Sequence, residues 1–217
     1  MTFPFPFMPP SVGATVTKTD DPTDDTSLTI YTLSALFGSG LKKIVACPVG
    51  SRATAGAKTV SSLIIDGTTA SLVKRQNTSG GNGCEIWQAN GITASSGNIV
   101  VTWSAGMQGC GVGVFAVYDA GSSSYASTSS TADPMNATID VPAMGVLIGV
   151  GVNDAGGTFA WTNLTERYDE QYDAGGPGNH TGASDAFEAA QTALSVTCDP
   201  SAAGADNAMV LASWGPA

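Results

Sequence analysis

The feature that most constrains this sequence is the stretch of residues 98–118, in which two apolar runs are joined by a glycine-containing turn. Successive side chains of a β-strand point to opposite faces, so the first run places Ile99, Val101 and Trp103 on one face. The second run, residues 110–118, is apolar or small on both faces. The pattern predicts a central hairpin covered on both sides, and it contains no catalytic signature.

The composition favours strands and turns along the whole chain. Of the 217 residues, 12% are charged, 42% are hydrophobic and 27 are glycines. Long amphipathic helices would need more Lys, Glu, Arg and Leu. About a dozen short apolar runs, with turn signals at roughly 8–12-residue intervals, therefore predict an all-β fold, an antiparallel jelly-roll-like β-sandwich.

Several local patterns predict particular connections. Asp66-Gly67 is typical of a type I′ hairpin turn. Residues 138–141 and 144–152 are expected to form a second hairpin, and residues 121–132 a flexible surface loop. For residues 184–193, an extended segment stays open, although propensity favours a short helix. No internal repeat is visible, and one sandwich domain is expected over residues 11–217.

Charge and cysteine usage exclude some classes of partner. The net charge of −10 argues against nucleic acid or an anionic membrane, because phosphate groups require a cationic face. The N-terminal sequence has neither the cationic start of a signal peptide nor a membrane span. The four cysteines are far apart and three lie in apolar runs, so buried thiols are expected in preference to disulfides.

Residues 1–10 predict an extended arm that precedes the sandwich. Four prolines exclude a helix or a central strand, and they alternate with apolar side chains. Such an arm would fold back over its own domain or dock on a neighbouring subunit or partner. The anchoring side chains in the second case would be Phe3, Phe5, Phe7 and Met8.

Few residues suggest chemistry. The single histidine, His180, lies in a glycine-rich segment and is expected on a mobile surface loop. The densest polar cluster is TERYDEQYD at residues 165–173, where four acidic residues alternate with Tyr168 and Tyr172. This cluster has three alternative interpretations. It could provide a carboxylate pair for glycoside hydrolysis, or it could bind a sugar or a cation. The favoured interpretation is a solvated strand edge or a subunit contact.

The order of several segments resembles a family of jelly-roll structural proteins of tailed bacteriophages. These segments are NIVVTWS, GVGVFAVYDAG, TIDVPAMGVLIGVGVND, FAWTNLTERYDEQYDAG and SDAFEAAQT, and the resemblance covers roughly residues 60–214. It implies a non-enzymatic virion protein, displayed on the particle surface as a head decoration, spike or tail component and assembled in the host cytoplasm without a signal peptide.

The resemblance gives no catalytic residue to transfer, and no cofactor or metal ligand is expected. The expected partners are other virion proteins, bound through the N-terminal arm. Further copies of the chain are also expected partners, and a trimer is one of the oligomers considered. Nucleic acid and membranes are not expected partners. The alternative is a carbohydrate-binding module or adhesin tip. It would use exposed aromatic side chains beside a groove, namely Tyr125, Tyr168 and Tyr172.

Overall fold

The computed structural model describes residues 13–217 except 52–55, 57, 79, 173–175, 177 and 205. Within these residues the chain forms eighteen strands and no helix. All the strand pairings are antiparallel. The prediction of an all-β sandwich is confirmed, whereas its jelly-roll connectivity stays a prediction.

The strands form four sheets, which we number I to IV. Sheet I contains, in spatial order, β3 (Leu28–Leu36), β9 (Ser96–Met107), β5 (Val60–Ile65) and β6 (Thr68–Thr69). Sheet II contains β1 (Thr15–Asp20), β10 (Gly109–Tyr118), β4 (Lys42–Ser51), β8 (Gly83–Ile92) and β7 (Ser71–Asn77), and β2 (Thr23–Asp24) also pairs with β10. Sheet III contains β11 (Ala126–Ser130), β18 (Ala208–Trp214), β13 (Gly145–Asn153), β16 (Asn179–Phe187) and β15 (Glu166–Gln171). Sheet IV contains β12 (Met135–Val141), β17 (Gln191–Pro200) and β14 (Phe159–Thr162).

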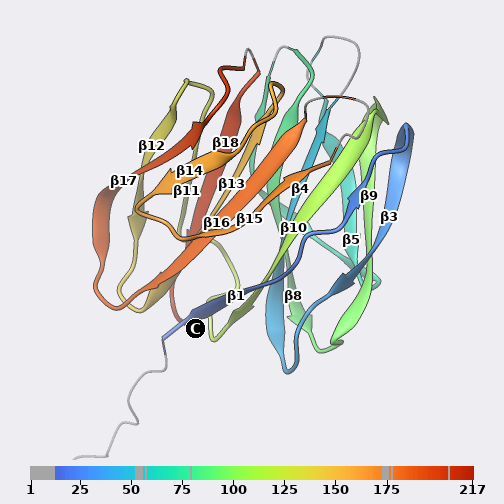
Figure 1. Ribbon diagram of the computed structural model, residues 1–217. Coiled ribbons are helices and arrows are strands. Elements are labelled where there is room, and N and C mark those ends of the chain that lie inside the picture. The colour runs from blue at the N-terminus through green and yellow to red at the C-terminus, as the bar shows by residue number, and fades with distance from the viewer. Residues whose placement is uncertain are drawn as a thin grey trace, which may run out of the picture.

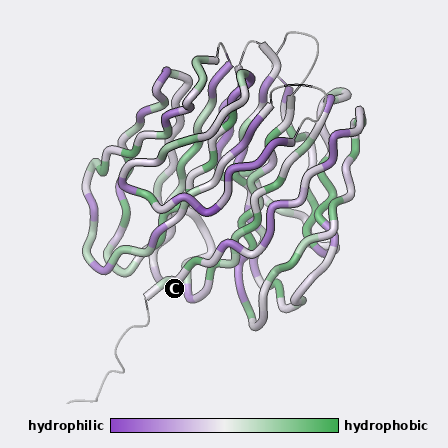
Figure 2. Tube along the Cα trace, in the orientation of Figure 1, coloured by the Kyte–Doolittle hydropathy of each residue, from purple (hydrophilic) through white to green (hydrophobic). Residues whose placement is uncertain are grey.

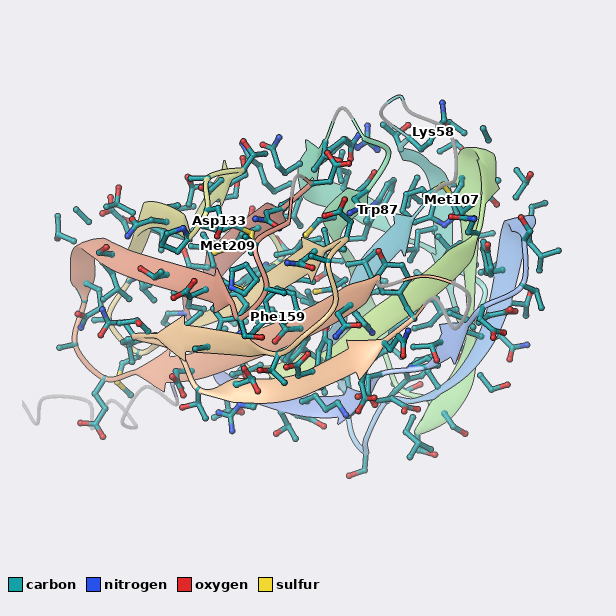
Figure 3. All side chains as sticks on the ribbon, turned by 45° about the horizontal axis from the view of Figure 1, so that its top comes forward. Lys58, Trp87, Met107, Asp133, Phe159 and Met209 are labelled. Atoms are coloured by element: carbon teal, nitrogen blue, oxygen red, sulfur yellow. The ribbon has the colours of Figure 1, made fainter. Side chains whose placement is uncertain are left out.

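The four sheets stack in the order I, II, III, IV, from right to left in Figure 1. Three apolar cores separate them. The first lies between sheets I and II, the second between sheets II and III, and the third between sheets III and IV. In Figure 3, Trp87 and Met107 mark the first core, while Phe159 and Met209 mark the third. Sheets II and III are therefore apolar on both faces, which explains the long fully buried runs of β10, β13 and β18.

The two halves of the chain have the same strand order. When the short β2 and β6 are set aside, β1 to β10 and β11 to β18 each provide eight strands. In both halves the larger sheet contains the first, eighth, third, sixth and fifth strand, in that order, and the smaller sheet the second, seventh and fourth. The molecule thus consists of two sandwiches with one topology, joined face to face. The repeat lies in the connectivity, which is why the sequence does not reveal it.

Two of the three predicted hairpins are wrong, and only the hairpin around Asp66-Gly67 is confirmed. β9 belongs to sheet I and β10 to sheet II, so the two runs of residues 98–118 face each other across the first core. β12 and β13 are divided between sheets IV and III in the same way. The alternation of side chains shows which faces of a strand are apolar. It does not show whether the next strand in sequence is its hydrogen-bonded neighbour or lies in the opposite sheet, because both arrangements bury the apolar faces equally well.

Two local predictions also need correction. Residues 184–193 contain no helix, because Ser184 to Phe187 continue β16 and β17 begins at Gln191. The expected loop at residues 121–132 contains β11, which pairs with β18. Tertiary pairing overrides local propensity in both places. At Asp66 and Gly67 the φ angles are 46° and 76°, as a type I′ turn requires, and all four cysteines are buried free thiols as expected.

Candidate functional site

The expected anchoring residues Phe3, Phe5, Phe7 and Met8 lie outside the described residues, so their role stays a prediction. The described chain begins at Gly13 beside the β12–β13 connection. There the backbone N–H of Ala14 donates a hydrogen bond to the Met144 carbonyl at 2.8 Å. The described part of the chain therefore enters β1 from a point close to Met144.

The three tyrosines expected to bind a glycan do not form one exposed surface. Tyr125 is 62% exposed and precedes β11, whereas Tyr168 and Tyr172 are 6% and 1% exposed. The prediction that the last two would be exposed is wrong. Both contribute to the second core, where a stacked sugar would have to displace sheet II from sheet III.

His180 lies in the same core and not on a surface loop as predicted. It is fully buried on β16. The centroid of its ring lies 5.0 Å from the ring centroid of Tyr168 and 5.5 Å from that of Tyr172. Opposite it, a side chain at Gly111 would approach the imidazole to 2.7 Å, and one at Gly113 would overlap the Tyr168 hydroxyl. These two glycines let sheet III approach sheet II closely.

The surroundings of His180 keep its imidazole neutral. Burial, with a smaller contribution from the Lys18 ammonium, lowers its pKa to about 3. Neither ring nitrogen has a hydrogen-bond partner among the described residues. A general acid or base needs a pKa near neutrality and access to substrate, so His180 is poorly suited to catalysis.

The acidic segment forms β15, an edge strand of sheet III. Glu166 and Glu170 are exposed and four positions apart, which separates them by roughly 13 Å along an extended strand. A hydrolytic carboxylate pair must be about 5–9.5 Å apart. Asp169 accepts a hydrogen bond from the Phe159 N–H at 2.9 Å. Burial raises the pKa of Glu166, and the nearby Asp169 carboxylate adds to the effect.

The part of the chain that the structure describes contains no group of three or more His, Cys, Asp and Glu side chains placed to hold a metal ion. Nor do those residues include a helix of the length and hydropathy needed to cross a membrane.

The outer face of sheet I is uncharged, although the chain as a whole is acidic. The four strands of this sheet contain no charged residue. Three cross-strand neighbours at its centre are Thr32, Val100 and Ile64. In Figure 2 the strands of this sheet, at the right, are mainly green and white. An uncharged sheet surface of this kind is typical of a contact with another protein.

β3 is the edge strand of sheet I, and three of its side chains are large, apolar and exposed. Leu28, Ile30 and Leu36 are 41%, 55% and 59% exposed. Exposed apolar edge strands without charges or prolines are open to pairing with another chain. The alternation of apolar residues on both faces of residues 28–36 is a signal in the sequence that could have indicated this edge.

The corresponding edge strand of the second half is polar. β12 occupies in sheet IV the place that β3 occupies in sheet I. Its exposed side chains are Asn136, Thr138 and Asp140. Because the two halves share one topology, the apolar character of β3 does not follow from the fold itself. It distinguishes one outer face of the molecule from the other.

Comparisons with known proteins add no identification. No protein-family model matches the chain, and no curated protein is similar to it in sequence. The features that bear on function are therefore the stack of sheets, the uncharged face of sheet I and the β3 edge.

Proposed function

We propose that this chain is a non-enzymatic structural protein of a bacteriophage particle, exposed on the particle surface as a head decoration, spike or tail component. The type of particle rests on the resemblance in segment order. The assembly role rests on one observation, the uncharged outer face of sheet I with its exposed β3 side chains. In a chain with a net charge of −10, such a face reduces the electrostatic repulsion between copies.

The N-terminal arm is the second contact in this proposal. Phe3, Phe5, Phe7 and Met8 would bind another virion protein or a neighbouring copy, while the four-layer body forms the exposed part. No observation favours the glycan-binding alternative to the same degree, since two of its three tyrosines are buried.

The experiment is to measure the mass of the purified chain in solution by sedimentation and light scattering, beside a form that lacks residues 1–10. A homo-oligomer has a multiple of the 21.8 kDa chain mass. An oligomer that dissociates without the arm would make the arm the contact, and one that persists would make the body the contact. A single-chain mass for the full-length protein at 100 µM, on the order of the concentration at which weak contacts form, would contradict self-assembly.

Particle attachment requires a separate measurement. The chain without residues 1–10 is compared with the full-length chain for incorporation into particles assembled in the host. We expect incorporation to fall when the arm is absent. Equal incorporation of both forms would exclude the arm as the anchor.

A further inference from the structure

A surface depression of about 350 Å³ lies where β1 begins, at the lower end of the molecule in Figure 1. Its lining comes from the start of β1, the β12–β13 connection and the end of β16. Five of the seven lining residues have no polar side chain, and the two largest of these, Met144 and Phe187, are partly exposed. The depression is therefore a mainly apolar hollow on the surface of an acidic protein.

The backbone of Met144 is held from both sides of the depression. Its N–H donates a hydrogen bond to the Glu188 carbonyl at 3.2 Å, and its carbonyl accepts one from the Ala14 N–H at 2.8 Å. Its φ angle is 57°, in the left-handed region that favours glycine. Methionine adapts its shape to apolar partners, which explains its presence at a position where the backbone would favour glycine.

The arm of residues 1–10 has the composition to fill this hollow. It carries Phe3, Phe5 and Phe7 between prolines, and it has no charged side chain. Phenylalanine rings pack well against a thioether and against another ring. Proline-rich segments also lose little conformational freedom on docking, because their φ angles are already fixed.

The spacing between the arm and the depression favours the arm of a second copy. Gly13 lines the depression, and Phe7 precedes it by six positions, which an extended chain covers in roughly 20 Å. An arm that returned to its own depression would have to reverse within this interval. Pro9 and Pro10 disfavour the reversal, because proline is unfavourable at the second central position of a type I turn and cannot adopt the positive φ of type II.

We propose that this depression is the receptor for the N-terminal arm of a second copy of the chain, with a phenylalanine ring of that arm against Met144 and Phe187. The inference rests on the proposed role of the arm as a contact and adds the surface that the arm binds. The contact joins unlike surfaces of two copies, so it forms a closed ring when the rotation between copies allows closure. No residue of the depression belongs to sheet I, so the two contacts are separable.

The test combines two full-length variants, each of which lacks one half of the contact. The first carries Phe3→Ser, Phe5→Ser and Phe7→Ser together and keeps its depression. The second is Ala186→Lys, which places a charge in the depression and keeps the arm. We expect each variant alone to self-associate about tenfold or more weakly than the unchanged protein, and an equimolar mixture to associate more strongly than either component. Sedimentation and light scattering over a concentration series measure these masses.

Ala160→Lys is the matched control, because Ala160 is also an exposed alanine on a strand and does not line the depression. It should associate as the unchanged protein does. The proposal would be overturned by a mixture that associates no more strongly than its components, by an unaffected Ala186→Lys, or by an equal loss in Ala160→Lys. If the oligomer persists in every variant, only this inference fails and sheet I remains the contact. A single-chain mass for the full-length protein would contradict self-assembly as a whole.

A peptide of residues 1–10 gives a second measurement if Ala186→Lys fails to fold. In excess over the full-length protein, the peptide should displace the arms and lower the average mass. The same peptide with serine in place of its three phenylalanines should leave the mass unchanged. Equal effects of the two peptides, or no effect of either, would also overturn the proposal.

Discussion

At the scale of single residues, His180 shows how the second core controls charge. The imidazole is enclosed by Tyr168, Tyr172 and the glycines of β10, so protonating it would place a cation in an apolar layer beside Lys18. The folded state therefore binds this proton only near pH 3, whereas an unfolded chain binds it near pH 6.5. Above pH 6.5 both states are neutral at this residue.

This difference predicts an acid-sensitive stability. Between about pH 6.5 and pH 3 the unfolded chain binds the extra proton, so the free energy of unfolding decreases as the pH falls. We expect the unchanged protein to lose up to about 1.4 kcal/mol per pH unit more than His180→Phe over this interval. Urea unfolding at a series of pH values measures both slopes. Parallel curves for the two proteins would show that His180 is not the group responsible.

At the scale of secondary-structure elements, β3 combines two properties that strands usually avoid together. It is an edge strand, and it exposes Ile30 and Leu36 without a charged residue. At one end of the strand the Leu36 N–H donates a hydrogen bond to the Asp20 carboxylate at 2.7 Å, and at the other end the Leu28 N–H donates to the Tyr31 hydroxyl at 3.2 Å. A charge introduced on the exposed side should therefore oppose association without disturbing the first core.

We expect Ile30→Lys to weaken self-association through sheet I by about tenfold or more, because a lysine would be desolvated in the contact. The matched control is Thr138→Lys on β12, the corresponding strand of the second half. Sedimentation over a concentration series gives the association constants. If both variants associate as the unchanged protein does, sheet I is not the contact.

At the scale of the whole molecule, the second core joins the two sandwiches into one unit. Val45 and Phe115 of sheet II meet Val150 and Trp214 of sheet III in a layer whose members are fully buried. Separating the halves would expose this layer to water, at roughly 25 cal/mol per Å² of apolar surface. Neither half is therefore expected to unfold while the other stays native.

The corresponding prediction is a single unfolding transition. Each half carries two tryptophans, Trp87 and Trp103 in the first and Trp161 and Trp214 in the second. In the protein labelled with fluorotryptophan, all four ¹⁹F resonances should lose their native intensity at the same urea concentration. Loss of the first pair before the second would show that the halves unfold independently.

The sequence by itself determined the strand content, the interior position of the long apolar runs, the Asp66-Gly67 turn and the burial of the thiols. These properties depend on local composition and side-chain alternation, which a strand carries wherever it lies. Of the candidate sites, only the exposure of Tyr125 and the edge position of the acidic segment could be anticipated.

Only the tertiary structure decided which strands are neighbours. A strand apolar on both faces can pair with the next strand or face it across a core, so β9 and β10 could not be assigned to sheets from their pattern alone. The burial of His180 and that of Lys43 depend on segments distant in the chain, β10 for the first and Gly121 with Trp214 for the second. The burial of a side chain and its contacts are properties of the packed molecule. The surroundings of His180 and Lys43 therefore could not be predicted from the sequence around each residue.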